Sequence, residues 1–146
     1  MANGSILVVG GEVGSNGAPE PTLEILPTPA GGDTYLFMDW LNNTDPNNLY
    51  PFLHVLPSGN IFVGYYNQAR ILNPKTFDTI NTLPDMPGSV TSNIAGRTYP
   101  MEGTAVLLPQ VSTISPLANR ILIVLLSSLL TRIPSQSSCV EVLTSV

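Results

Sequence analysis

The sequence has 146 residues, with 14 Pro and 12 Gly; 43% of its residues are hydrophobic and only 10% are charged. So much proline and glycine excludes a helical bundle or a coiled coil, and the hydrophobic content argues against intrinsic disorder. The net charge is −5 and Lys and Arg form no runs, so we expect no nucleic acid and no anionic membrane surface as a partner.

Short aliphatic and β-branched runs bounded by Gly, Pro and Asn recur along the whole chain, and no window has apolar residues at helical spacing. This pattern predicts an all-β protein. The ten predicted strands are, in chain order, Ile6–Val9, Leu23–Leu26, Tyr35–Met38, Phe52–Leu56, Ile61–Tyr65, Ala69–Leu72, Thr79–Leu83, Thr104–Leu108, Ile121–Leu125 and Val140–Leu143.

Three of these strands begin with the same pattern, a polar turn followed by aliphatic residues. The starting points are Ile6, Ile61 and Ile121, which are 55 and then 60 residues apart. This spacing is close to the roughly 50-residue period of kelch propeller blades. A further strand follows each starting point in the same order, at Thr22–Leu26, Ala69–Asn73 and Cys139–Leu143.

The repeat predicts a partial kelch-type β-propeller of about two and a half four-stranded antiparallel blades. The chain would hold the last three strands of one blade, all four of a second and three of a third. Propellers close with about four to eight blades, so we expect an arc of a larger ring. Its exposed blade edges would favour self-association.

Two turns have clear sequence signatures. Pro57–Asn60 separates two strands, and Gly59 within it adopts positive φ without a steric cost, so this segment predicts a hairpin. Asn73-Pro74-Lys75 predicts a second turn. We expect a further hairpin between Gly103–Leu108 and the strand at Ile121.

Three observations bear on the location of the protein. The longest apolar run, Ile121–Leu130, is far shorter than the roughly 20 residues that a membrane-spanning helix needs, so we interpret it as a buried strand and expect no membrane partner. Residues 1–15 lack a basic start and a long apolar segment, so no signal peptide is predicted. The single cysteine, Cys139, cannot form an internal disulfide, which leaves the compartment unknown.

Three stretches resemble the N-terminal domain of glyoxal oxidase, a copper radical oxidase of the galactose oxidase and kelch group. They are Asn3–Pro29, Asn48–Pro87 and Ala95–Gln110, and the segments NLYPFLHVLPSGN and RTYPMEGTAVLLP within them are the most specific. The resemblance implies a seven-bladed propeller and a secreted enzyme that oxidises small aldehydes to carboxylic acids while reducing O₂ to hydrogen peroxide.

The resemblance also implies one copper ion held by two tyrosines and two histidines, with one tyrosine cross-linked to a cysteine. Imidazole and phenolate are suitable ligands for copper. In the family, the cross-linked pair would precede Met1, and the other ligands would follow Val146. We therefore predict no catalytic, cofactor-binding or metal residue in this chain. No cofactor is expected in it, and a small aldehyde would be a substrate of the full-length protein only.

The resemblance weakens after the strand at Ile121. The family would continue into a Cys-Gly-Gly-like segment, as the first strand here continues into Gly10-Gly11, but this chain continues with aliphatic residues and serines to Leu130. We therefore divide the chain into a propeller segment, residues 1–123, and a divergent C-terminal tail, residues 124–146. An altered reading frame or a splice product would explain the tail.

Several side chains allow both a functional interpretation and a structural one. His54 is the sole histidine and alternates with apolar residues on a predicted strand, so we expect a structural role, because a metal needs three or four converging ligands. Aromatic residues favour strands, so we expect structural roles for the tyrosines as well. They are Tyr35, Tyr50, Tyr65, Tyr66 and Tyr99.

The remaining candidates also favour structural interpretations. Cys139 has no basic neighbour to activate it and is expected to be a small buried residue. Gly10–Gly14 lacks the Lys-Ser/Thr ending of a phosphate loop, so the glycine pair indicates a strand exit where blades crowd. The acidic turn residues Asp39, Asp45, Asp78 and Asp85 have no metal-ligand spacing, and one histidine cannot support a Ser-His-Asp assignment.

Two functions remain open. The chain is either an inactive piece of a glyoxal oxidase-like scaffold or a kelch-like structural or binding module for a protein or glycan. In the second case the loops Thr44–Leu49 and Pro87–Arg97 would make the contacts, because propeller loops carry such functions.

Overall fold

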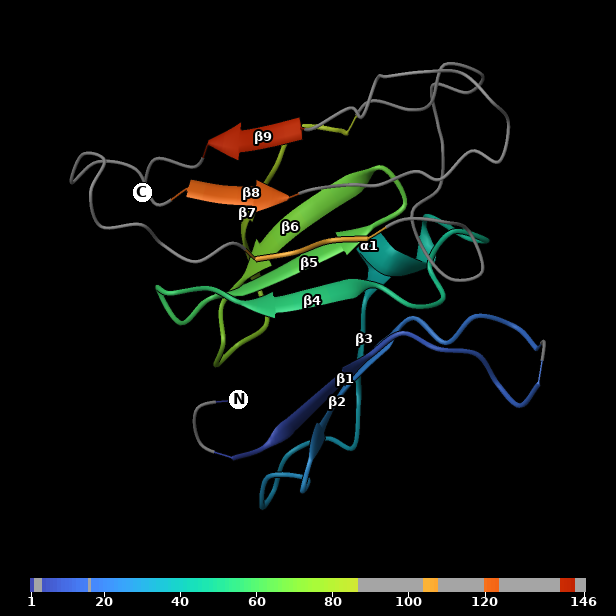
Figure 1. Ribbon diagram of the computed structural model, residues 1–146. Coiled ribbons are helices and arrows are strands. Elements are labelled where there is room, and N and C mark those ends of the chain that lie inside the picture. Colours follow the sequence, from blue (N-terminus) through green and yellow to red (C-terminus); the bar gives the residue numbers. More distant parts are fainter. Residues whose placement is uncertain (2–3, 16, 87–103, 108–119, 124–139, 144–146) are drawn as a thin grey trace.

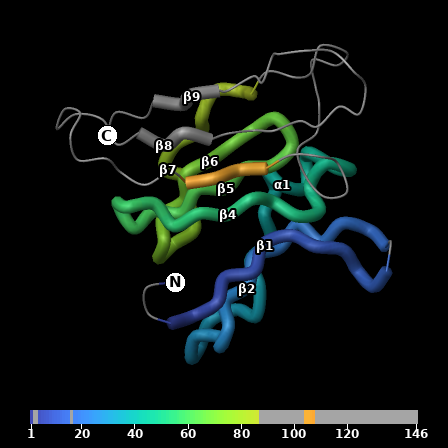
Figure 2. The backbone as a smooth tube through the Cα atoms, in the orientation of Figure 1, coloured from blue at the N-terminus to red at the C-terminus, as the bar shows by residue number. Residues whose placement is uncertain are grey.

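The computed structural model describes residues 1, 4–15, 17–86, 104–107, 120–123 and 140–143, which form three antiparallel sheets and one short helix (Figure 1, Figure 2). This all-β architecture confirms the predicted fold class and is consistent with part of a propeller. Within the described part, no helix is long and apolar enough to cross a bilayer. The elements are β1 (Ile6–Val9), β2 (Thr22–Leu26), β3 (Leu36–Phe37), α1 (Asp39–Asn42), β4 (Phe52–Val55), β5 (Ile61–Tyr65), β6 (Gln68–Leu72), β7 (Thr79–Thr82), β8 (Arg120–Ile123) and β9 (Val140–Leu143).

The strand pairing follows the predicted repeat. The first sheet has the order β1-β2-β3, the second β4-β5-β6-β7 and the third β8-β9. In each sheet the strand that begins at a repeat point pairs antiparallel with the strand predicted to follow it: Ile6 lies opposite Leu26, Ile61 opposite Leu72 and Ile121 opposite Val142. The same stretch of each repeat therefore forms the same structural unit.

Two elements differ from the sequence prediction. The pattern predicts a strand over Thr104–Leu108, but residues 104–107 have no strand structure. The carbonyl oxygen of Ala105 accepts a hydrogen bond from the His54 side chain, so a side chain takes the place of a strand partner there.

The pattern does not predict the one-turn helix α1. This helix forms because Leu41 is fully buried between the first two sheets while the polar residues around it face outward.

The predicted strand Tyr35–Met38 is also shorter than expected. Only Leu36 and Phe37 pair with β2, because Met38 is already the residue that precedes α1. Met38 instead buries its side chain in the core between the first two sheets. The chain thus leaves the first sheet early and crosses to the second.

The core lies on both faces of the second sheet, and β5 is buried on both sides. Toward the first sheet, one cluster joins residues of both sheets and of α1; its buried members are Val9, Leu23, Met38, Leu41, Ile61, Val63, Tyr65, Leu72 and Phe77. On the opposite face a second cluster surrounds Phe62 and includes Ala105. Alternate residues of one strand thus serve two separate cores, as expected for a strand in a stack of sheets.

Both predicted turns are confirmed. In the hairpin between β4 and β5, Gly59 has φ +86° and its N–H donates to the carbonyl oxygen of Leu56 at 2.8 Å. In the turn after β6, the side-chain oxygen of Asn73 accepts the backbone N–H of Lys75 at 2.8 Å. These local bonds fix the register of β5 against its two neighbours.

Candidate functional site

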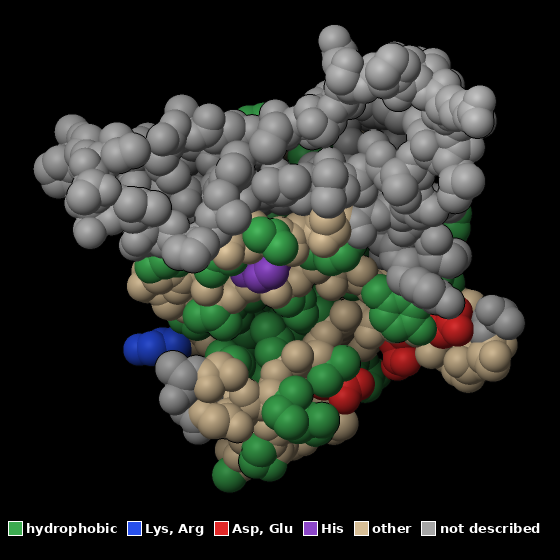
Figure 3. Space-filling view, viewed as in Figure 1, with side chains coloured by type: hydrophobic (Ala, Val, Ile, Leu, Met, Phe, Trp, Pro, Cys, Tyr) green, Lys and Arg blue, Asp and Glu red, His purple; other side chains and the backbone are tan. Residues whose placement is uncertain are grey.

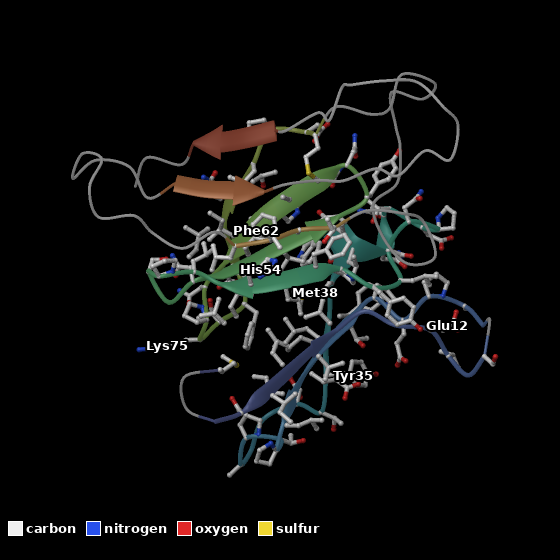
Figure 4. The ribbon with its side chains drawn as sticks, viewed as in Figure 1. Glu12, Tyr35, Met38, His54, Phe62 and Lys75 are labelled. Carbon is white, nitrogen blue, oxygen red and sulfur yellow. The ribbon has the colours of Figure 1, made fainter. Side chains whose placement is uncertain are left out.

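The single histidine of the chain makes a defined structural contact. His54 lies on β4, and its Nε2 donates to the carbonyl oxygen of Ala105 at 3.0 Å (Figure 4). Its ring also lies 6.2 Å from that of Phe62, centroid to centroid. The imidazole is partly exposed in Figure 3 and links the second sheet to residues 104–107. This arrangement agrees with the structural interpretation of His54.

Tyr65 is the tyrosine with the richest surroundings. Its side chain is fully buried at the end of β5, its hydroxyl accepts a hydrogen bond from Nε of Arg70 at 2.7 Å, and it donates to Oε1 of Gln68 at 3.1 Å. Trp40, from α1, covers this group: its ring lies 4.9 Å from the ring of Tyr65 and 5.3 Å from the guanidinium carbon of Arg70. The cluster therefore joins the helix of one repeat to the hairpin of the next.

The environment of Tyr65 changes its acidity. Burial of the phenol raises the pKa of Tyr65 above 10.0, while the hydrogen bond from Arg70 and its charge oppose the rise. Because the phenol is buried and hydrogen-bonded to Gln68 and Arg70, Tyr65 acts as a hydrogen-bonding core residue.

The other described tyrosines lie in different surroundings. Tyr35 and Tyr50 are exposed, Tyr66 is partly buried in the turn after β5 with φ +53°, and Tyr99 lies outside the described residues. The structure therefore does not bring the described tyrosines to one point. Cys139 also lies outside the described residues.

The glycine pair after β1 marks a place where two repeats touch. Gly10 has φ +71°, and a Cβ atom there would lie 2.6 Å from the carbonyl oxygen of Leu49 and 2.8 Å from Cδ of Pro51. The N–H of Gly11 donates to the same Leu49 oxygen. The interpretation as a crowded strand exit is therefore confirmed. These amides do not form an anion cradle, because Gly10 and Gly11 donate to backbone carbonyl oxygens.

The acidic candidates are dispersed. Asp39 begins α1, Asp45 and Asp78 lie in turns, and Asp85 follows β7. Among the described residues, no three or more His, Cys, Asp or Glu side chains are grouped to hold a metal ion.

The family-implied copper ion can be tested against these side chains. A site of two imidazoles and two phenolates needs converging ligands, whereas the chain has one histidine, whose Nε2 is bonded to a backbone carbonyl. The buried phenol of Tyr65 is held by Arg70 and Gln68. The described residues therefore do not fit the copper site, and no chemical step through copper follows from them.

Sequence reasoning missed one unusual group, Asn48, in the connection between α1 and β4. Its side chain is 1% exposed, and neither its Nδ2 nor its Oδ1 has a hydrogen-bond partner. Buried amides without partners are rare in native proteins and costly. Asparagine in a predicted loop ordinarily indicates an exposed turn, so no pattern in the sequence distinguishes this residue.

Sequence reasoning also missed the Trp40, Tyr65 and Arg70 cluster. Arg70 follows Tyr65 closely on the hairpin between β5 and β6, but Trp40 comes from a helix that the strand pattern does not predict. A hairpin register alone would have placed Tyr65 near Gln68. The contact with the helix depends on how the first two sheets pack.

Comparisons with known proteins give one family and several relatives. The family model described as glyoxal oxidase N-terminus matches residues 1–125. A WSC domain-containing protein of Arthroderma benhamiae is 67% identical over 110 residues, which are 75% of this chain and 12% of that protein. Aldehyde oxidase GLOX1 of Arabidopsis thaliana is 31% identical over 112 residues, which are 75% of this chain and 16% of that protein.

A third relative, aldehyde oxidase GLOX of Vitis pseudoreticulata, is 28% identical over 109 residues, 74% of this chain and 18% of that protein. The chain thus spans less than a fifth of the length of each of these three relatives. No solved structure matches it significantly.

Proposed function

Because this chain belongs to the glyoxal oxidase N-terminus family, we propose that it forms blades of the propeller scaffold of a copper radical oxidase and does not itself oxidise aldehydes. In the full-length proteins of this family, a small aldehyde would become a carboxylic acid while O₂ becomes hydrogen peroxide. The relatives named as aldehyde oxidases support this class of substrate. Secretion is part of the same proposal.

The observation that carries the scaffold proposal is the double burial of β5. Ile61 and Val63 pack against the first sheet, while Phe62 between them packs into the cluster on the other face. A sheet with two apolar faces needs a neighbour on each side, which is the arrangement of consecutive propeller blades.

A copper titration followed by a peroxide assay tests the proposed lack of activity. The 146-residue chain is incubated with copper and a small aldehyde, with aldehyde oxidase GLOX of Vitis pseudoreticulata as the positive control. We expect no peroxide above a copper-free sample. Copper-dependent turnover by this chain would contradict the proposal.

We further propose that the propeller segment comprises residues 1–123 and that residues 124–146 form a divergent C-terminal tail, although the family model extends to residue 125 and β9 of the tail pairs with β8. Sequencing the transcript tests this division. A spliced or frame-shifted message that restores a Cys-Gly-Gly-like segment after Ile123 would support it. An uninterrupted frame that encodes the present tail would argue against an altered reading frame.

A second candidate function is ligand binding through the loop Thr44–Leu49, with a protein or glycan as the ligand. Exposed residues of the loop, Asp45 and Pro46, favour it because they are accessible to a ligand, whereas the buried amide of Asn48 is not. The loop Pro87–Arg97 of the same hypothesis lies outside the described residues. A saturable partner in a pull-down, lost when the loop 44–49 is replaced, would support this function over the scaffold role.

A further inference from the structure

The sequence contains two triplets of the form Asn-X-Ser/Thr, which is the acceptor motif for N-linked glycans in secreted proteins. They are Asn3-Gly4-Ser5 and Asn42-Asn43-Thr44, and neither has a proline in the middle position. Asn3 lies outside the described residues. The second triplet begins at Asn42, the last residue of α1, and all three of its residues are described.

Asn42 is an exposed side chain on a well-anchored piece of backbone. The preceding residue, Leu41, is fully buried in the core between the first two sheets, whereas Asn42 and Asn43 are both exposed. The backbone N–H of Asn42 donates to the carbonyl oxygen of Met38 at 3.0 Å, and its own carbonyl oxygen accepts the N–H of Asp45 at 3.2 Å. The side-chain amide therefore stands at the surface of an ordered turn, where a bound sugar has room.

The place of α1 in the fold also suits a glycan. The ring of Trp40, on the same helix, lies 4.9 Å from that of Tyr65, the last residue of β5, so α1 lies at the ends of the strands (Figure 1). A glycan is bulky and hydrated, so on a sheet face it would prevent two sheets from stacking. Asn42 is exposed while the first two sheets are stacked, so a glycan there leaves the core between them intact.

The composition of the chain gives such a glycan a physical role. Only 10% of the residues are charged, against about 25% in an average protein. Charged groups are the main solvating groups of a protein surface, and this chain has few of them. An attached oligosaccharide adds many hydroxyl groups to the surface and so raises solubility without adding charge.

We propose that Asn42 is a site of N-linked glycosylation, an inference that rests on the secretion included in the proposed function. The donor is an oligosaccharide linked to a lipid through a diphosphate. Nδ2 of Asn42 forms a bond to the anomeric carbon of the sugar, and the bond between that carbon and the diphosphate oxygen breaks. The lipid diphosphate leaves with the electron pair, and one Nδ2 proton passes to a base of the transferase, so no oxidant or reductant is needed.

Thr44 indicates when the transfer takes place. In the folded chain Thr44 is 8% exposed, and its hydroxyl donates to the carbonyl oxygen of Leu41 at 2.9 Å. A transferase that recognises the Thr of the triplet cannot reach this hydroxyl after α1 has formed. The glycan is therefore added before the segment folds. The same hydrogen bond gives Thr44 a structural role, so variants of Asn42 separate glycosylation from folding better than variants of Thr44 alone.

The first test is cell-free translation of the full chain, behind a cleavable leader peptide, in the presence of microsomes of the endoplasmic reticulum. The leader supplies entry into the lumen, so the result does not depend on secretion of the natural protein. Asn42→Gln removes the acceptor amide. Asn43→Gln is the matched control, because it makes the same chemical change at the neighbouring exposed residue and leaves the triplet intact.

We expect a glycan on Asn42 in the protease-protected wild-type chain and in Asn43→Gln, and its loss in Asn42→Gln. Peptide N-glycosidase converts the glycosylated asparagine to aspartate, so the mass of the peptide distinguishes Asn42 from Asn3. Thr44→Ser should keep the glycan and Thr44→Val should lose it, because only serine retains the hydroxyl. Protected wild-type chain without a glycan on Asn42 would overturn the proposal.

The second test asks whether the folded protein accommodates the sugar. The glycosylated chain and Asn42→Gln, both secreted from the same yeast, should unfold at the same urea concentration, because the exposed side chain makes no part of the core. A clearly lower midpoint for the glycosylated chain would also overturn the proposal. Neither test measures peroxide, so their failure would leave the proposed scaffold function standing, and copper-dependent turnover in the peroxide assay would leave the glycan site standing.

Discussion

Gly10 offers the sharpest test of how the first two repeats fit together. In Gly10→Ala, the new methyl group would lie 2.6 Å from the Leu49 oxygen and 2.8 Å from Cδ of Pro51, and neither is the end of a flexible side chain. Gly14 is the matched control, because it has the same φ of +71° but no atom within 4 Å of the position that a new methyl group would take. The two substitutions share the backbone strain and differ only in crowding.

The expected magnitudes follow from these two terms. A left-handed backbone at a non-glycine residue costs about 1–2 kcal/mol, so both variants lose this much stability. Overpacking against rigid neighbours adds about 1–3 kcal/mol in Gly10→Ala alone. The difference between the two free energies of unfolding therefore isolates the contact between the β1 exit and the connection that leads into β4.

The measurement is urea unfolding at low protein concentration, monitored by the fluorescence of Trp40, the only tryptophan in the sequence. Its ring contacts Tyr65 between the two sheets, so it reports on the junction itself. With a typical urea dependence of about 1–3 kcal/mol per molar, the midpoint of Gly10→Ala should lie roughly 1 M below that of Gly14→Ala. Equal midpoints would refute the reasoning, because they would mean that the close approach has no energetic consequence.

Four other substitutions test the core and the candidate site. Phe62→Ala should cost about 3–5 kcal/mol in urea unfolding, because Phe62 is 1% exposed, whereas Phe37→Ala in the dilute chain should cost less than about 0.5 kcal/mol, and similar losses would place the core elsewhere. Tyr65→Phe leaves the Arg70 N–H without its acceptor and should cost about 1–3 kcal/mol. Because burial raises the pKa of Tyr65, wild-type stability should hold below pH 10.0 and fall as the pH rises through the folded pKa, and an equal fall in Tyr65→Phe would contradict this assignment. His54→Leu should lose about 1 kcal/mol through its missing hydrogen bond, while calorimetric titration with copper should give the same heat as for the unchanged chain; a lost binding signal would assign His54 to a metal site.

Much of the fold could be predicted because it depends on local patterns. The repeat points Ile6, Ile61 and Ile121 predicted which strands pair, and the structure confirms those pairs. Turn residues such as Gly59 act through their own backbone preferences, which a sequence displays directly. The strand predicted at residues 104–107 is wrong because a distant residue decides the structure there. The side chain of His54, 51 positions away, bonds the Ala105 carbonyl that a strand partner would have used.

The candidate site was also only partly predictable from the sequence. The residue types of the chain, with one histidine and scattered acids, already argued against a metal centre. The cluster of Trp40, Tyr65 and Arg70 and the unpartnered amide of Asn48 could not be predicted, because each depends on which surfaces meet when two sheets stack.

The sequence by itself determined the all-β class, the repeat and the turns, since alternation and turn chemistry act over a few residues. Only the tertiary structure decided that β5 serves two cores, that Gly10 is held against the next repeat and that Ile6 and Val8 on β1 stay exposed. Burial depends on which surfaces pack together in three dimensions. Equivalent isoleucines of two repeats therefore differ: Ile6 is exposed and Ile61 is buried.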